Sequence, residues 1–406
     1  MTVNLRGMSR PMRRRGVLRR PSMSSADFDI QMMRRAIRLA MNGRGFVEPN
    51  PMVGCVLVKD GRVIGEGYHE KVGEAHAEPN ALANCTEDPH GSTAYVTLEP
   101  CCHVNKRTPP CSPRLIEAGI ARAVIGAIDP NPEVNGNGIA MLRAAGIDVT
   151  TGALERECNQ LLAPFIAMTR YKRPYVTMKW AETADGKIAG PGGRRMRISG
   201  EKSNKVVHEL RGRCDAILVG INTVLADDPT LTARDVVFSR LHTRFVLDSR
   251  LRIPMDCELV KSAGDMNVTI YFDAEAIGRN AEKMKALLKA GVRLVARHAG
   301  IHGRLRLPEI LAHIAGNDVT HLLVEPGPTL AEGFFEANAV DRLWVIRSKD
   351  KLDDPTAPAV ARVPDDFIPT GEIELAGDVL TEYLNPASPV FFAAEASADF
   401  RMATAV

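Results

Sequence analysis

Residues 73–111 read GEAHAEPNALANCTEDPHGSTAYVTLEPCCHVNKRTPPC, and this stretch carries both a secondary-structure pattern and a group of reactive side chains. A helix is expected to begin near His76, and the segment Thr93–Leu98 predicts a strand. A helix over Ser112–Ala118 and a strand over Ala123–Ile128 are expected to follow. This alternation predicts an α/β layer structure.

The segments before and after this stretch extend the same pattern. Ser24 and Asp27 resemble a capping box at the start of a helix that ends at Gly43. The dipeptide Asp60-Gly61 is a strong signal for a β-hairpin. The further elements expected here are the hairpin strands Val53–Val58 and Arg62–Tyr68, the helix Gly138–Ala145 and the strand Ile147–Val149. We therefore expect a first domain over residues 26–170.

A second domain is expected over residues 174–393, because the segment Tyr171–Pro174 interrupts the pattern before a new strand at Tyr175–Trp180. Helices and strands alternate again after this break, which predicts a second α/β domain. The expected elements are a helix at 202–211, strands at 216–220, 244–247 and 268–272, a helix at 281–289 and a strand at 321–324. Residues after Lys349 show no clear pattern.

Composition favours a globular protein over a membrane protein or a chain-wide nucleic-acid binder. The 406 residues are 45% hydrophobic, and 52 basic residues against 49 acidic ones give a net charge of only +3. No apolar run is long enough to span a bilayer. Arginines are concentrated before Asp27, so residues 1–25 are expected to form a disordered basic tail, with an organellar transit peptide as the alternative. We expect a cytoplasmic protein, or an organellar one under that alternative.

The histidine, glutamate and cysteines of the opening stretch form a pattern typical of a zinc site. Eight cysteines are too few for a disulfide scaffold in 406 residues, whereas Cys101, Cys102 and Cys111 lie within eleven positions. His76, Cys101 and Cys111 would supply three zinc ligands and leave a fourth position for water, as in catalytic zinc sites. Glu78 would accept and return protons. A His-x-Glu segment followed by Pro-Cys and a later cysteine is typical of zinc-dependent nucleobase deaminases.

Other interpretations of these residues stay open at this point. The histidine and cysteines could be incidental buried side chains, or Cys102 or His103 could complete a structural zinc site with four ligands. Cys102 could also replace Cys101, because it lies nine positions before Cys111. Cys101 is preferred, since it follows Pro100 as the first cysteine of the deaminase signature does.

Five segments of the first half resemble the bifunctional riboflavin-biosynthesis deaminase-reductase family. They are Pro49-Asn50-Pro51, Val53-Gly54-Cys55, Gly73-Glu74-Ala75-His76-Ala77-Glu78, Thr97-Leu98-Glu99-Pro100-Cys101 and Arg107-Thr108-Pro109-Pro110-Cys111. The resemblance implies a cytidine-deaminase-like α/β/α fold and hydrolytic deamination of 2,5-diamino-6-(5-phosphoribosylamino)pyrimidin-4(3H)-one. It also implies that Asn50 binds the ring and that His103 and Arg107 meet the substrate phosphate. The chain departs from the family by one extra residue between Cys101 and Cys111.

Three segments of the second half, residues 178–189, 224–232 and 324–333, are similar to the reductase half of the same family. The similarity implies a dihydrofolate-reductase-like α/β fold and NADPH-dependent reduction of the ribosyl group to a ribityl chain. The implied cofactor-binding residues are Ala181, Arg197, Thr223, Asp227, Ser249, Gly327, Pro328, Thr329, Leu330, Ala331, Glu332 and Gly333. The implied substrate-binding residues of this half are Arg195, Arg211, Leu231, Arg234 and Glu325.

Arg197 stands where many family members have a tryptophan, and an arginine there could pair with the additional phosphate of NADPH. One alternative hypothesis is therefore a deaminase whose second half is a non-catalytic nucleotide-binding or assembly module. Another is a deaminase that acts on nucleic acid and uses the arginine-rich tail as its anchor. We prefer a small-molecule substrate, with no nucleic-acid or membrane partner. The resemblance also implies a homodimer formed through the second domain.

Overall fold

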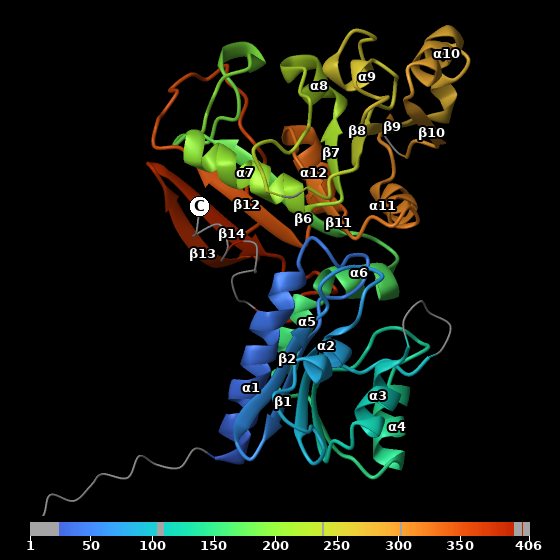
Figure 1. Cartoon of the computed structure of the whole chain (residues 1–406). Coiled ribbons are helices and arrows are strands. Elements are labelled where there is room, and N and C mark those ends of the chain that lie inside the picture. The colour runs from blue at the N-terminus through green and yellow to red at the C-terminus, as the bar shows by residue number, and fades with distance from the viewer. Residues whose placement is uncertain (1–23, 104–108, 238, 301–302, 394–399, 401–406) are drawn as a thin grey trace, which may run out of the picture.

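The computed structural model describes residues 24–103, 109–237, 239–300, 303–393 and 400, and it contains two sheets (Figure 1). The five-stranded sheet has the order β2-β1-β3-β4-β5, and the nine-stranded sheet has the order β10-β9-β8-β7-β11-β6-β12-β14-β13. Each sheet carries its own helices, as expected for two α/β domains. Residues 1–23 of the expected basic tail, and Arg107, lie outside the described residues.

The first domain opens with a capped helix and a hairpin. Ser24 caps helix α1 (Ser25–Ala40) by accepting a hydrogen bond from the amide of Asp27, and the short helix η1 (Met41–Gly43) follows. Strands β1 (Gly54–Lys59) and β2 (Arg62–Tyr68) pair in antiparallel fashion. The turn residues Asp60 and Gly61 have φ of 50° and 74°, as a two-residue hairpin turn of this type requires.

Strands and helices then alternate through the rest of the first domain. The elements are α2 (Ala77–Ala83), β3 (Thr93–Leu98), α3 (Cys111–Glu117), β4 (Arg122–Ala127), α4 (Asn137–Ala144), β5 (Asp148–Thr151), α5 (Glu155–Leu161) and α6 (Ala163–Tyr171). Strands β3, β4 and β5 are parallel, whereas β1 is antiparallel to β3. A Cβ atom on Gly67 would lie 2.3 Å from the amide nitrogen of Ala81, so glycine allows α2 to pack directly against β2.

The second domain is built on seven parallel strands and an antiparallel hairpin. The strands are β6 (Tyr175–Glu182), β7 (Ala216–Gly220), β8 (Thr243–Leu247), β9 (Asn267–Asp273), β10 (Arg293–Arg297), β11 (His321–Val324), β12 (Arg342–Arg347), β13 (Ile368–Leu375) and β14 (Asp378–Leu384). The hairpin β13–β14 joins the sheet through antiparallel pairing of β14 with β12. It occupies the region after Lys349, for which no element was expected from sequence.

Helices cover both faces of this sheet, which explains why its central strands are apolar on both sides (Figure 1). On β7, Ile217 and Val219 pack into one core, while Ala216 and Leu218 pack into the other. The first core includes α7 (Glu201–Arg213), α8 (Ile221–Asp227), α9 (Glu258–Lys261) and α10 (Ala281–Lys289). The second core includes α11 (Leu307–Ala315) and α12 (Pro328–Glu336). The short helices η2 (Pro191–Gly193) and η3 (Ala274–Ala276) lie in loops.

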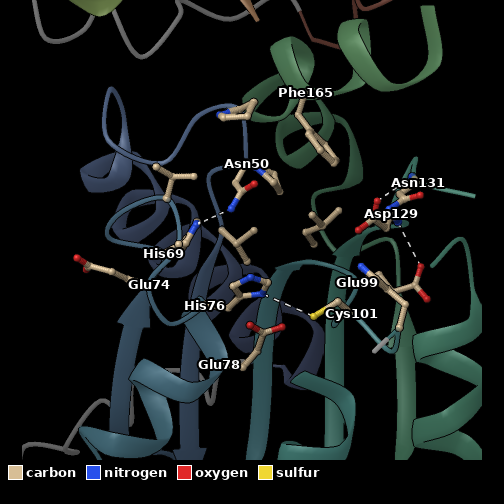
Figure 2. Close-up of a pocket in the computed structure, with 17 residues that line it drawn as sticks. Asn50, His69, Glu74, His76, Glu78, Glu99, Cys101, Asp129, Asn131 and Phe165 are labelled. Carbon is tan, nitrogen blue, oxygen red and sulfur yellow. Dashed lines mark hydrogen bonds between the residues drawn. The ribbon is translucent and has the colours of Figure 1, made fainter. Parts of the chain in front are cut away.

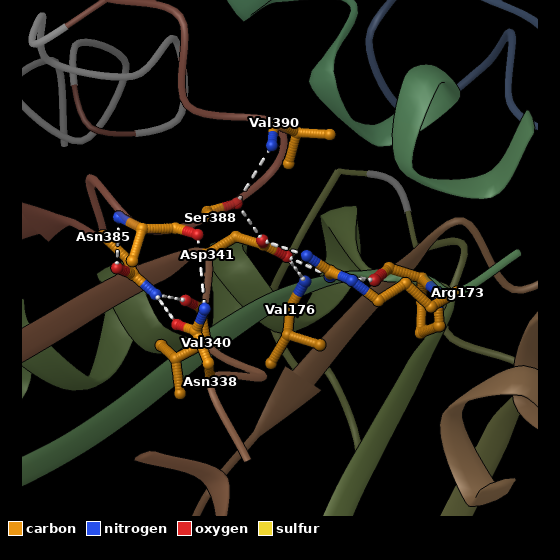
Figure 3. A network of polar contacts seen from close by, with 10 residues as sticks. Arg173, Val176, Asn338, Val340, Asp341, Asn385, Ser388 and Val390 are labelled. Atoms are coloured by element: carbon orange, nitrogen blue, oxygen red, sulfur yellow. Dashed lines mark hydrogen bonds and ion pairs between the residues drawn. The ribbon is translucent and has the colours of Figure 1, made fainter. Parts of the chain in front are cut away.

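The junction between the domains is organised by Asp341, which is 3% exposed (Figure 3). Its Oδ1 accepts hydrogen bonds from Arg173 Nη2 at 2.6 Å and from Ser388 Oγ at 2.5 Å. Its Oδ2 accepts from Arg173 Nη1 at 2.7 Å and from the amide of Val176 at 2.8 Å. One buried carboxylate therefore connects the interdomain linker, the start of β6 and the segment after β14.

The C-terminal segment returns to the first domain. Val390 is 1% exposed and belongs to the first-domain core. The amides of Phe392 and Ala393 donate to Gln160 Oε1 on α5, and Arg156 Nε donates to the carbonyl of Phe392 at 2.6 Å. The last residues assigned from sequence to the second domain thus pack on the first.

Most elements expected from sequence are present, with ends shifted by one or two residues. The expected strands 216–220 and 321–324 and the helix 281–289 match β7, β11 and α10. The elements α5, α6, α8, α9, α11, β10 and β12–β14 were not predicted. Among the described residues, no helix combines the length and the apolar character needed to cross a bilayer.

Replacement of Asp341 by Asn should destabilise the protein strongly. The Asp341 side chain is 1% exposed, and the substitution leaves the Arg173 guanidinium partly buried without its carboxylate. We expect a loss of about 3–5 kcal/mol in the free energy of unfolding. Asp365→Asn is the matched control, because Asp365 is 80% exposed and pairs with the exposed Arg362; its loss should stay within about 1 kcal/mol. Urea unfolding followed by circular dichroism measures the free energy of unfolding of each variant. Equal losses in the two variants would contradict the stabilising role of Asp341 at the domain junction.

Candidate active site

The metal-ligand candidates of the first domain come from three separate elements that meet at one end of its sheet. His76 is the residue before α2, Cys101 lies just after β3, and Cys111 is the first residue of α3. The amide of Cys111 donates to the carbonyl of Cys101 at 3.0 Å, and the amide of Ser112 donates to the same carbonyl at 3.1 Å. These bonds hold the start of α3 beside the end of β3.

The donor atoms of these residues have the separations that a tetrahedral zinc ion requires. His76 Nδ1 lies 3.6 Å from Cys101 Sγ and 3.4 Å from Cys111 Sγ. Zinc bond lengths of about 2.3 Å to sulfur and 2.0–2.1 Å to nitrogen in a tetrahedral site place these atoms about 3.6 Å apart. Among the described residues, these three form the group of histidine, cysteine and carboxylate side chains close enough to share a metal ion. The residues present therefore fit zinc.

Cys102 and His103 lie outside this group of three. Cys102 Sγ is 4.0 Å from the carbonyl of Glu133, and His103 Nε2 is 4.0 Å from Glu133 Oε2. The geometry thus brings Cys101, and not Cys102, to His76 and Cys111. A fourth protein ligand, which a structural zinc site would require, is not part of the described cluster.

Glu78 lies in the first turn of α2 and is 3% exposed (Figure 2). Burial raises the pKa of its carboxyl group, the nearby Cys101 raises the pKa further, and His76 lowers it. A buried carboxyl group with a raised pKa beside a cavity is suited to exchange protons with a bound ligand.

A cavity of 570 Å³ lies above these residues (Figure 2). Asn50 points into it from the loop before β1, and its Nδ2 lies 3.2 Å from His69 Nε2. His69 Nδ1 lies 2.9 Å from the carbonyl of Ala75, so Nδ1 donates there and Nε2 accepts from Asn50. This pair fixes the orientation of the Asn50 amide.

Several cavity residues were missed by the sequence analysis, namely His69, Asp129, Asn131 and Phe165. His69 comes directly after β2, and Asp129 and Asn131 follow β4. Polar residues just beyond predicted strands were the available signal for these three. Phe165 lies on α6, which the sequence analysis did not predict, so it gave no comparable signal.

Glu99 stabilises a loop next to the cavity. Its two oxygens accept hydrogen bonds from the amides of Asp129, Gly136, Gly138 and Ile139 at 2.8–3.2 Å. These amides belong to the loop after β4 and to the start of α4, where a carboxylate is favourable. Glu99 therefore holds the loop that brings Asp129 and Asn131 to the cavity.

The second domain has its own pocket, of 930 Å³, at the carboxyl ends of β6, β7 and β11. Ten of the residues expected in its cofactor and substrate sites line this pocket. They are Ala181, Arg195, Arg197, Arg211, Thr223, Asp227, Arg234, Glu325, Gly327 and Pro328. Lys179, Asn204, His208 and Asn222 also line it and were not predicted.

The remaining expected residues of the second domain do not line this pocket. Leu231 is 2% exposed and packs in the hydrophobic core, and Ala331 is fully buried in the core under α12. Ser249 lies after β8, outside the pocket lining. Thr329, Leu330, Glu332 and Gly333 continue along α12 beyond the pocket.

An arginine–carboxylate pair organises the floor of this pocket. Arg211 donates from Nε and Nη2 to the two oxygens of Glu325 at 2.7 and 2.8 Å, and from Nη1 to the carbonyl of Thr232. Burial opposes ionisation of Glu325, but Arg211 and Lys179 outweigh it and lower its pKa to about 2. Burial in turn lowers the pKa of Lys179.

Comparisons with known proteins agree with this two-site architecture. Residues 26–127 match the cytidine and deoxycytidylate deaminase zinc-binding region, and residues 174–347 match the RibD C-terminal domain. The chain is 44% identical to the riboflavin biosynthesis protein RibD of Actinobacillus pleuropneumoniae over 78% of this chain and 82% of that protein. It is 39% identical to the RibD protein of Escherichia coli over 78% and 86% of the two chains.

Solved structures show the same arrangement of two domains. A diaminohydroxyphosphoribosylaminopyrimidine deaminase/5-amino-6-(5-phosphoribosylamino)uracil reductase from Thermotoga maritima is 33% identical, with a TM-score of 0.76, and the match covers 89% of this chain and all of that one. RibD of Acinetobacter baumannii is 31% identical with the same TM-score, over 89% and 99% of the chains. These matches do not favour a deaminase with a non-catalytic second half. The chain belongs to the RibD family of bifunctional deaminase-reductases of riboflavin biosynthesis.

Proposed function

We propose that the chain performs two successive reactions. The first domain, with zinc, hydrolyses an amino group from the ring of 2,5-diamino-6-(5-phosphoribosylamino)pyrimidin-4(3H)-one. The second domain, with NADPH, reduces the ribosyl group of the product to a ribityl chain. The observation that carries the proposal is the cluster of His76, Cys101 and Cys111 beneath a cavity that also contains the buried Glu78.

In the first reaction, His76, Cys101 and Cys111 would hold the zinc ion and Glu78 would move the protons. Zinc in such a site supplies a Lewis acid that lowers the pKa of water to about 7. Glu78 takes the two protons of the attacking water in turn, and it delivers one to the adjacent ring nitrogen and the other to the departing amino nitrogen. The ring carbon keeps the water oxygen as a carbonyl, and the nitrogen leaves as ammonia. Asn50, oriented by His69, holds the ring during this exchange.

In the second reaction, the charge of the pocket supports binding of two phosphate-bearing molecules. Its lining includes the cations Lys179, Arg195, Arg197, Arg211 and Arg234 against the carboxylates Asp227 and Glu325. Glu325 is already paired with Arg211, so a surplus of positive charge faces the pocket. Gly327 and Pro328 place the start of α12 there, where the helix dipole favours an anionic group. NADPH bound in this pocket would supply the hydride that reduces C1 of the sugar.

The zinc assignment predicts different metal contents for two neighbouring cysteine variants. Cys101→Ser removes a ligand from the cluster and should abolish stoichiometric zinc, whereas Cys102→Ser should retain about one zinc per chain. Elemental analysis of the purified proteins measures this difference, and circular dichroism checks that both are folded. Zinc loss in the Cys102 variant with retention in the Cys101 variant would reverse the assignment.

Glu78→Gln should stop deamination without affecting reduction. The variant keeps the size of the side chain and the three zinc ligands, but it cannot carry a proton, so ammonia release should fall by roughly 10²–10⁴-fold. NADPH oxidation with the deaminated substrate should be unchanged, because the second pocket is untouched. Glu87→Gln, which alters an exposed carboxylate paired with Arg62, is the control. Substantial ammonia release by the Glu78 variant would rule out its role in proton transfer.

Arg234→Ala should weaken substrate binding in the second pocket. Arg234 is exposed at this pocket and contacts Thr230 and His208, so its guanidinium can reach a bound phosphate. We expect the KM for the deaminated substrate to rise about tenfold, with the KM for NADPH within about twofold of wild type. Steady-state NADPH oxidation measures both constants, with Arg362→Ala as a surface control. An increase confined to the KM for NADPH would assign Arg234 to the cofactor.

A further inference from the structure

An arginine of the second domain reaches the loop that supplies Asn50 to the first-domain cavity. Arg240 lies between α8 and β8, and its Nη1 donates to Glu48 Oε2. Its Nη2 donates to Asp215 Oδ1. Arg240 and Glu48 are separated by 192 positions in the sequence, yet their side chains are only 12% and 16% exposed. The contact is therefore a partly buried salt bridge between the two domains.

Arg240 is held rigidly on its own side of this bridge. Its amide donates to the carbonyl of Gly212 at the end of α7 at 2.8 Å. Its partner Asp215 has a side chain that is 1% exposed. Asp215 Oδ2 accepts hydrogen bonds from the amide and hydroxyl of Thr320, both at 2.7 Å, and from the amide of His321 at 3.0 Å. The guanidinium is thus fixed by the amino edge of the nine-stranded sheet.

On the other side, Glu48 connects directly to the cavity loop. Its Oε1 accepts from the amide of Gly45 at 3.3 Å, and the next residues, Pro49, Asn50 and Pro51, all line the cavity. The amide of Asn50 donates to the carbonyl of Val47 at 2.9 Å. A displacement of Glu48 would therefore be passed to the Asn50 side chain and to its hydrogen bond with His69.

Arg240 provides the cation that Glu48 faces. Burial raises the pKa of the Glu48 carboxyl, Arg240 lowers it, and Asp215 raises it. Without Arg240, the Glu48 carboxylate would still be buried near the Asp215 carboxylate but would have lost its positively charged partner. A carboxylate in that position either takes up a proton or moves toward solvent, and either change releases the loop.

We propose that Arg240 is a positioning residue for the deaminase site, so that the second domain sets the substrate affinity of the first. The inference rests on the proposed deamination. The inference predicts that loss of Arg240 alters only the cavity loop. The two domains remain joined by the Arg173–Asp341 network and by the C-terminal segment on α5. Loss of Arg240 leaves those contacts in place and changes the loop at residues 45–51.

The experiment compares full-length, zinc-loaded wild-type protein with Arg240→Ala and Arg240→Lys. For Arg240→Ala, the KM for deamination should rise about tenfold while kcat changes less than about threefold, because the loop binds substrate and does not move protons. Arg240→Lys keeps a positive charge that can reach one carboxylate but not both. Its KM should therefore lie between those of the wild type and Arg240→Ala. The reductase constants should not change, since Arg240 lies outside that pocket.

A double variant separates positioning from general loosening of the interface. In Glu48→Gln/Arg240→Ala, the loop no longer carries the carboxylate that faced Arg240, while Asp215 keeps its hydrogen bonds from Thr320 and His321. The KM should therefore fall back toward the wild-type value. Arg156→Ala is the matched control, because it also removes a contact between the domains but does not touch the loop. Its deaminase KM should be unchanged.

Amide hydrogen exchange of the 45–52 segment gives a readout that does not depend on activity. Exchange there should be faster in Arg240→Ala than in wild type or in Arg156→Ala. An unchanged KM and unchanged exchange in Arg240→Ala would overturn the inference, as would an equal rise of KM in Arg156→Ala. Wild-type protein that releases no ammonia would contradict the proposed function instead, and the exchange measurement would still decide whether Arg240 holds the loop.

Discussion

Two buried carboxylates at the amino edge of the nine-stranded sheet determine how the domains meet. Asp215 directly precedes β7 and Asp341 directly precedes β12. Each accepts backbone amide hydrogen bonds from a neighbouring strand start and each binds an arginine, Arg240 or Arg173. A buried carboxylate is tolerated only when such donors surround it. The same interactions that satisfy these charges therefore fix the linker and the loop that face the first domain.

This arrangement uses the two ends of the parallel strands for different purposes. Tyr175, at the start of β6, packs in the first-domain core, whereas Ala181, near the end of the same strand, lines the second-domain pocket. The amino ends are occupied by the domain junction, so the carboxyl ends remain available for the pocket, as is usual for open parallel sheets. The contact with the first domain and the second-domain pocket therefore lie toward opposite ends of β6.

Three glutamates, two of them buried and one partly buried, show how surroundings assign different roles to one residue type. Glu99 is saturated by four backbone amides and holds a loop. Glu325 is locked in a two-point pair with Arg211, and its pKa is about 2. Glu78 is buried with a raised pKa at the base of a cavity, which suits proton transfer. Residue type and burial alone would not have distinguished them; the difference lies in the donors each carboxylate meets.

The sequence by itself determined the elements and the chemistry that depend on neighbouring residues. The Ser24 cap, the Asp60-Gly61 hairpin and the α/β alternation follow from local backbone preferences and from hydrophobic spacing. His76, Glu78, Cys101 and Cys111 were recognisable because their spacing along the chain is short. Elements without a strong local pattern, such as α6 and the β13–β14 hairpin, were not predicted, because packing stabilises them more than propensity does.

Only the tertiary structure decided which distant residues meet. It brought Cys101 rather than Cys102 to His76, placed His69 against Asn50, and placed Leu231 and Ala331 in hydrophobic cores instead of a pocket lining. It also brought Arg240 to Glu48 and the C-terminal residues to α5. No local signal marks such contacts, because each results from the packing of whole elements whose positions depend on the completed fold.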